Sequence, residues 1–178
     1  LGQTTKSMGM PNARLQFSFR QRPQPERSGR DNITFLFSAN KNIPEQNVAD
    51  IASGGEIARL MLALKALISG SRNLPTVIFD EIDTGVSGTM AEKMANVMLQ
   101  MPQNCQVICI SHLPQIAARG HQHYRVYKEE SENGTASHIV RLSDEERISE
   151  IANMLSGVEM TQAAIDNARA LLHYQEKA

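Results

Sequence analysis

The stretch Thr76-Val77-Ile78-Phe79-Asp80-Glu81-Ile82-Asp83-Thr84-Gly85-Val86-Ser87 decides the fold of this 178-residue chain. Its first four residues favour β structure without alternating, which predicts a strand covered on both faces. A helix is expected from Gly88 to Met101, before Pro102, and Gln106–Ile110 repeats the buried-strand pattern. Two such strands joined through a helix form a βαβ unit, so we predict an α/β fold with a parallel sheet.

Polar residues follow both of these strands directly. Ligands of open α/β sheets bind beyond the carboxyl ends of the strands. Asp80 and Glu81 could divide the work there, one holding hydrated Mg²⁺ and the other accepting a proton from an attacking water. Acidic residues at a helix N-terminus are an equally good interpretation, because the helix dipole favours them. His112 follows the second strand and is predicted on the same edge as the carboxylates.

A second candidate site lies at Ser53-Gly54-Gly55-Glu56, before a predicted helix over Ile57–Ser69 that ends at Gly70. Ser53 and Glu56 have the spacing of a capping box, which needs no ligand. A capping box does not need the two glycines between these residues. Glycines there expose backbone N–H groups and let an anion such as a phosphate approach closely.

The flanking segments predict smaller elements. Alternation over Arg14–Arg20 and over Ile33–Phe37 indicates a half-buried antiparallel pair of strands, and residues 1–13 read as a lead-in. The stretches Gln21–Asp31 and Ala39–Ala52 contain prolines among polar residues and are expected to be loops.

The carboxyl-terminal third predicts two edge strands and two helices. The edge strands are His123–Lys128 and Ser137–Leu142, which flank the polar turn Glu129–Gly134. One helix begins at a capping box of Ser143 with Glu146 and ends at Gly157, and another runs over Thr161–Glu176.

Composition narrows the class of protein. Apolar residues make up 41% and charged residues 21%, which suits a packed core and not a disordered chain. The net charge of 18 − 19 = −1 argues against a wholly basic nucleic-acid coat. Residues 1–50 carry 7 − 4 = +3 and residues 51–178 carry 11 − 15 = −4. Candidate DNA contacts in the basic part, where a solvated strand face is the alternative, are Arg14, Arg20, Arg22, Arg27 and Arg30.

The sequence also bears on the cellular compartment of the protein and on whether the chain is a fragment. No apolar run approaches the ~18–20 residues of a membrane span, and no signal peptide is visible. Cys105 and Cys109 fit neither a disulfide framework nor a zinc site, so we expect two buried, reduced thiols in a cytosolic protein. The chain opens on Leu1, which suggests a fragment.

In combination these motifs resemble the ATP-binding-cassette (ABC) ATPases. Ser53–Glu56 resembles their signature motif, Val77–Glu81 the Walker B strand, Asp83–Ser87 the D-loop and His112 the switch histidine. The resemblance narrows to the RecN family of bacterial DNA-repair proteins, relatives of the SMC proteins. The strings that carry it are Met10–Ala13, Phe35–Asn40, Ile51–Glu56, Ile78–Gly88 and Ser111–Ala117. Ser87 stands where the wider superfamily usually has aspartate, which supports the narrower resemblance and weakens any analogy to D-loop aspartate chemistry.

The resemblance implies a composite ATP site. Asp80 would hold Mg²⁺ through water, Glu81 would activate the attacking water and His112 would contact the γ-phosphate. Ser53, Gly54 and Gly55 would close over a nucleotide held by a second head. Glu56 and the D-loop residues Asp83 and Ser87 are further expected nucleotide-binding residues. The phosphate-cradling Walker A loop is absent, since Gly2-Gln3-Thr4-Thr5-Lys6-Ser7 lacks its second glycine. That loop is expected in an amino-terminal half of the protein, with Leu1–Ser7 as a coiled-coil stump.

We therefore predict one domain, the carboxyl-terminal lobe of a P-loop NTPase head of ABC/SMC type, with a peripheral antiparallel β element and carboxyl-terminal helices. Its segments would be 1–13, 14–52, 53–142 and 143–178. The expected function is ATP hydrolysis with head dimerisation in double-strand-break repair, in a cytoplasmic, nucleoid-associated protein without membrane contact. The isolated chain is expected to be inactive. The alternatives are a non-hydrolysing dimerisation or DNA-interaction module of the same fold and a metal-dependent hydrolase using Asp80, Glu81, Asp83 and His112.

Overall fold

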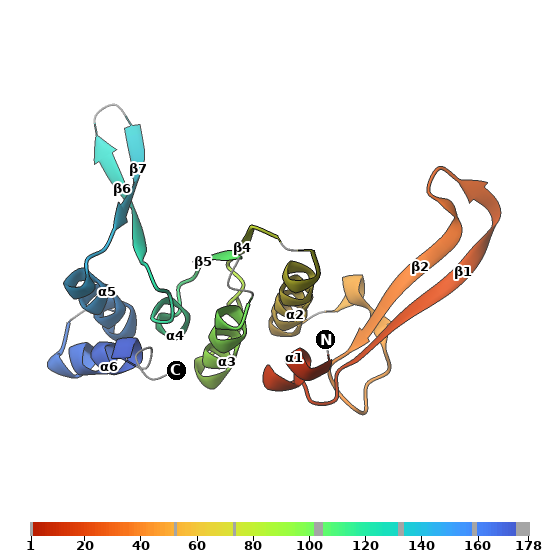
Figure 1. The fold of residues 1–178 in the computed structure, drawn as a ribbon, viewed down its shortest axis with the longest axis horizontal. Coiled ribbons are helices and arrows are strands. Elements are labelled where there is room, and N and C mark those ends of the chain that lie inside the picture. The colour runs from red at the N-terminus through yellow and green to blue at the C-terminus, as the bar shows by residue number, and fades with distance from the viewer. Residues whose placement is uncertain are drawn as a thin grey trace. The chain divides into compact units, whose positions relative to one another are not determined.

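The computed structural model describes residues 2–51, 53–72, 74–101, 105–131, 134–157 and 160–173 (Figure 1). The chain divides into two compact units, Leu1–Ile108 and Cys109–Ala178. Each unit has a core of its own: Met10, Phe37 and Leu60 are buried together in the first, and Ile151 and Ala168 in the second.

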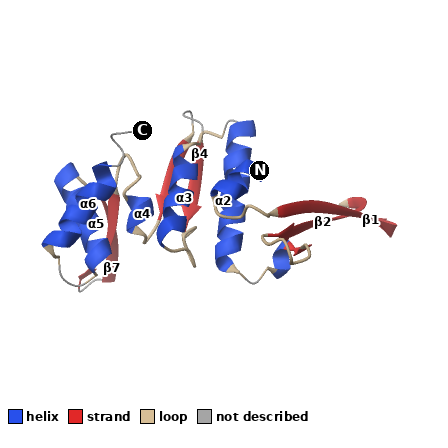
Figure 2. Ribbon diagram, turned by 90° about the horizontal axis from the view of Figure 1, so that it is seen from below, coloured by secondary structure: helices blue, strands red, loops and turns tan. Residues whose placement is uncertain are grey.

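A long antiparallel hairpin opens the first unit after the short helix α1 (Gly2–Ser7). Strands β1 (Arg14–Glu26) and β2 (Gly29–Ser38) pair with Phe17 opposite Phe35, which confirms the predicted antiparallel pair. Figure 2 shows this hairpin projecting from the helices of its unit. Its outer part remains in water, since the side chains of Phe17 and Phe19 are 58% and 68% exposed.

The predicted loop over Gln21–Asp31 is wrong, because both strands continue through it. The register shifts between Gln21 and Glu26, and both prolines of the segment lie inside this shift. A proline costs little at such an irregularity, since no ladder hydrogen bond is required of its missing N–H. The predicted loop over Ala39–Ala52 likewise contains a short strand β3 (Gln46–Asn47) and a 3₁₀ turn η1 (Val48–Asp50).

The βαβ prediction is confirmed. Strand β4 (Thr76–Asp80) and strand β5 (Gln106–Ile110) form a parallel two-stranded sheet, and helix α3 (Gly88–Leu99) joins them. Before them, helix α2 (Gly54–Arg72) runs two residues past the predicted stop at Gly70.

Strand β4 is buried on one face only, which corrects the sequence prediction. Val77 and Phe79 are buried, whereas the Ile78 side chain on the opposite face is 54% exposed. On β5, Ile108 is 41% exposed. These apolar strands therefore have the composition of a doubly covered sheet but only one covered face in this chain.

The second unit follows its prediction in part. Helix α4 (Pro114–Ala117), which the sequence did not predict, leads to the two predicted strands, β6 (Tyr124–Ser131) and β7 (Gly134–Arg141). They pair with each other as an antiparallel hairpin in a sheet of their own and are not edge strands of the parallel sheet. Both strands extend into the predicted turn Glu129–Gly134, and its residues 132–133 lie outside the described chain.

Two helices complete this unit: α5 (Asp144–Ser156), which ends before Gly157, and α6 (Gln162–His173). The capping box of α5 is confirmed by two reciprocal bonds. Ser143 N donates to Glu146 Oε2 at 2.8 Å, and Glu146 N donates to Ser143 Oγ at 3.3 Å. The last part of the second predicted helix, from residue 174, lies outside the described chain.

The structure also tests the predictions about the two cysteines and about membrane-spanning helices. Cys105 and Cys109 are free thiols, but both are only half-buried, so the prediction that they are buried is wrong. Among the described residues, no helix combines the length and apolar character that a membrane span requires.

A half-buried histidine, His123, should make the second unit sensitive to acid. Burial, followed by the nearby Arg147 charge, lowers the pKa of His123 from its usual 6.5. Below that value the unfolded chain binds a proton that the folded chain resists, so the free energy of unfolding should rise with pH up to about 6.5. Urea denaturation of the protein between pH 5 and pH 8 should show this rise, and His123→Gln should flatten it. His121→Gln, at an exposed histidine, is the control, and an equal flattening there would contradict the assignment.

Candidate functional site

The first turn of α2 contains the glycine-rich candidate. Ser53 precedes the helix, and its hydroxyl accepts a hydrogen bond from Glu56 N at 3.4 Å, as the capping spacing predicts. Ser53 O accepts from Ile57 N at 3.1 Å, which begins the helical ladder. Ser53 and Gly54 are exposed, so the N-terminus of α2 faces solvent.

The two glycines of this turn have different surroundings. A Cβ added at Gly54 would meet no atom within 4 Å, so an anion could approach its backbone freely. A Cβ at Gly55 would lie 3.0 Å from Gly85 O, in the turn after β4. Gly85 has φ of +73°, a conformation that other residues adopt only with strain. Two glycines thus bring the start of α2 and the acidic turn into backbone contact.

The acidic pair after β4 lies open to solvent. Asp80 is the last residue of the strand and Glu81 the first beyond it, and both are exposed. Glu81 is the one described non-glycine residue with positive φ, +46°. Glu81 O accepts from Thr84 N at 3.2 Å and from Thr84 Oγ1 at 3.0 Å, which holds the turn closed. A non-glycine residue in this left-handed conformation is uncommon, because its backbone is strained there.

The two D-loop candidates have opposite environments. Asp83 is fully buried, and its carbonyl accepts from Val86 N at 3.0 Å. Its carboxylate therefore lies inside the first unit. Ser87 is exposed at the start of α3, and its hydroxyl makes no capping bond to that helix.

His112 belongs to the second unit, where it follows β5 and precedes α4. It is exposed. The neighbouring Ser111 Oγ accepts from Leu113 N at 3.0 Å, and Leu113 caps α4. The exposed imidazole is thus carried on a short, hydrogen-bonded turn.

One neighbour of the site was missed from the sequence. Asn40 Nδ2 donates to Glu56 Oε1 at 3.5 Å, across sixteen residues of chain. The string Phe35–Asn40 contributes to the family resemblance, but no periodicity or spacing in the sequence connects it to α2.

The next question is whether side chains of the described residues could by themselves bind a metal ion. Within the described ranges, no group of three or more His, Cys, Asp and Glu side chains could hold a metal ion. The metal-dependent hydrolase using Asp80, Glu81, Asp83 and His112 stays an alternative prediction; of its carboxylates, Asp80 and Glu81 are exposed and Asp83 is buried. A single exposed carboxylate such as Asp80 fits instead a magnesium ion whose other ligands are water and phosphate oxygens.

Comparison with solved structures identifies the class of fold. The Smc head domain with a coiled coil and joint from Pyrococcus yayanosii superposes with a TM-score of 0.65 at 19% identity, over 87% of this chain and 28% of that one. The SmcHead bound to the C-winged helix domain of ScpA gives 0.61 at 20% identity, over 83% and 42%. The fold is that of part of an SMC-type ATPase head.

Sequence relatives identify the family. The DNA repair protein RecN of Deinococcus radiodurans is 39% identical over 94% of this chain, and that of Haemophilus influenzae is 37% identical over 96%. The RecN of Halalkalibacterium halodurans is 43% identical over 82% of the chain. No protein-family profile matches. The chain belongs to the RecN family of SMC-like ABC ATPases. It spans 29%, 31% and 26% of these three relatives, less than a third of their length.

The glycine contact can be tested through stability. Gly55→Ala should lower the free energy of unfolding by about 1–2 kcal/mol, because its methyl group would press on Gly85 O. Gly54→Ala, one residue earlier with open space around it, should change stability by about 0.5 kcal/mol or less. Urea denaturation of both variants makes the comparison, and equal midpoints would show that the two backbones can separate without cost.

Proposed function

We propose that this chain is the carboxyl-terminal half of the ATPase head of a RecN-like protein, and that the head hydrolyses ATP in the repair of DNA double-strand breaks. The observation that supports this most directly is the contact of Gly55 with Gly85, because it joins the signature-like helix start to the turn that follows the Walker B-like strand. Membership of the RecN family supports the choice of ATP as substrate and DNA repair as process.

Each residue has a role in this proposal. Asp80 holds Mg²⁺ through a water molecule, and its exposure at the end of β4 suits an outer-sphere ligand. Glu81 orients the attacking water and accepts its proton, and its constrained backbone suits a base that must point in one direction. His112 contacts the γ-phosphate. When bound, Mg²⁺ would neutralise charge on the phosphate oxygens.

The start of α2 serves a different nucleotide in the proposal. Ser53, Gly54 and Gly55 present the N-terminus of a 19-residue helix to the γ-phosphate held by a second head. Glu56 belongs to the first turn of that helix and Ser87 is exposed before α3, whereas the buried Asp83 supports the turn from within. Two heads would join when ATP is shared between them, since these contacts exist only in the dimer.

The ATP-cradling loop is expected in the amino-terminal half of the same protein. Exposed apolar side chains on the first unit support a covering partner of this kind. They are Leu67 and Ile68 on α2, Ile78 on β4 and Ile108 on β5. Ile68 and Ile78 also line one hollow. A two-stranded parallel sheet is too small to be stable alone, so a second lobe would supply both the cover and further strands.

DNA is the second expected partner. Arg14 is bound to three acceptors within the chain, and Arg22 is paired with Glu26 at 2.8 Å. Arg20 and Arg27 are therefore better placed for phosphate contacts than these two. The cytoplasmic, nucleoid-associated location also remains a prediction.

Removing the base should stop turnover without preventing assembly. In the complete protein, Glu81→Gln should lower kcat for ATP hydrolysis by about a hundredfold or more, the usual size of a general-base effect. ATP-bound dimers should accumulate, which analytical ultracentrifugation with and without ATP would measure. Turnover at the unmodified rate would remove Glu81 from the mechanism and favour the non-hydrolysing module.

The proposed lobe contact should appear as a stability effect. In the complete protein, Ile78→Asp would place a carboxylate under the second lobe and should lower the free energy of unfolding by about 2–4 kcal/mol. Val126→Asp is the matched control, because Val126 is 65% exposed on a hairpin of the other unit. Thermal unfolding measures both variants, and equal melting temperatures would indicate that Ile78 stays in water.

A further inference from the structure

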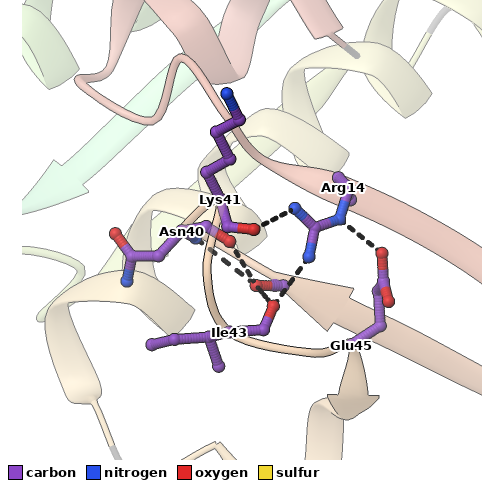
Figure 3. Close-up of polar contacts among 6 residues, drawn as sticks. Arg14, Asn40, Lys41, Ile43 and Glu45 are labelled. Atoms are coloured by element: carbon purple, nitrogen blue, oxygen red, sulfur yellow. Dashed lines mark hydrogen bonds and ion pairs between the residues drawn. The ribbon is translucent and has the colours of Figure 1, made fainter.

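The loop between β2 and β3 is held by one arginine. Arg14, the first residue of β1, donates from Nε to the Glu45 carboxylate, from Nη1 to Lys41 O at 3.0 Å and from Nη2 to Ile43 O at 2.7 Å (Figure 3). Bonds of this kind, with a charged donor, are about twice as strong as neutral ones. The hydrogen bond from Arg14 also lowers the pKa of Glu45 below its usual value. We refer to residues 40–45 with Arg14 as the loop clamp.

Ser38 fastens the same loop from inside. Its side chain is buried, and its Oγ lies 2.8 Å from Ile43 O and 2.9 Å from Asn40 O, within reach of donating to either. Asn40 N in turn donates to Ser38 Oγ at 3.4 Å. The backbone of Asn40 is thus fixed on one side of the loop clamp, and its side chain points away from Arg14 (Figure 3).

The loop clamp ends at the start of α2. The Asn40 amide reaches the Glu56 carboxylate at 3.5 Å, in the first turn of the helix. Beneath this polar contact, Phe37 of β2 and Leu60 of α2 are buried in one apolar cluster, with Ile57 packed against it. The base of the hairpin and the first turns of α2 are therefore joined both by a core and by a hydrogen-bonded loop.

We propose that Arg14 and Asn40 are positioning residues that fix the Glu56 carboxylate at the N-terminus of α2. A carboxylate beside a helix start repels the anion that the helix attracts. Because Asn40 donates to it, the Glu56 carboxylate is held on the side of the loop clamp. This inference rests on the proposed function, in which the exposed backbone of Gly54 faces the nucleotide of a second head.

The test separates dimerisation from nucleotide binding by one head. In the complete protein, Glu45→Gln and Asn40→Ala should each raise the protein concentration for half-maximal ATP turnover by roughly threefold to tenfold, as expected for one partly exposed hydrogen bond. The maximal rate at saturating protein, and the affinity of the monomer for a fluorescent ATP analogue, should stay within about twofold of the unmodified protein, because the loop clamp does not touch that nucleotide.

Matched variants decide the outcome. Glu26→Gln also removes a carboxylate that pairs with an arginine of β1, at 2.8 Å from Arg22, but it lies outside the loop clamp and should leave dimerisation unchanged. Arg14→Lys should have an intermediate effect, since an ammonium cannot hold the carboxylate and both carbonyls together. Glu45→Gln and Asn40→Ala proteins that dimerise normally would overturn the inference, as would a parallel loss of monomer ATP affinity. Absence of turnover in the unmodified protein would overturn the proposed function and this inference with it.

Discussion

The approach of two backbones at Gly55 and Gly85 is the constraint on which the candidate site depends. With only 3.0 Å between a prospective Cβ at Gly55 and the Gly85 carbonyl oxygen, the helix start and the acidic turn meet without any intervening side chain. The distance between the exposed backbone of α2 and the carboxylates after β4 is therefore set by main-chain geometry. Side chains at positions 55 and 85 would add volume and rotamers, which would make the separation of the two backbones larger and more variable.

The sequence predicted elements whose stabilising interactions are local. The helix start at Ser143, the end of α5 before Gly157 and the βαβ unit all depend on capping, on residue spacing or on a run of β-formers, and each is present. The positions of Asp80, Glu81 and His112 at strand ends also follow from the sequence, because these residues come directly after the two predicted strands. How the imidazole and the carboxylates are arranged relative to one another stays a prediction.

Errors occurred where distant segments decide the outcome. Pro23 and Pro25 suggested a loop, but the opposite strand tolerates them at a register shift, which no local pattern reveals. The position of Asp83 inside the unit depends on packing around the turn, whereas its neighbours Asp80 and Glu81 have the same chemistry and lie in water. The contacts of Arg14 with residues 41–45 span about thirty positions and follow from folding of the whole hairpin.

Helix α2 is unbroken for 19 residues, from Gly54 to Arg72, which corresponds to a rod about 28 Å long. In a straight helix of this length, a tilt of about 5° at the first turn displaces the last turn by roughly 2 Å. Leu67 and Ile68 lie on that far portion, more than two helical turns from Gly55. A small change in the tilt of the first turn is therefore amplified along the helix and displaces Leu67 and Ile68 by more than it displaces Gly55.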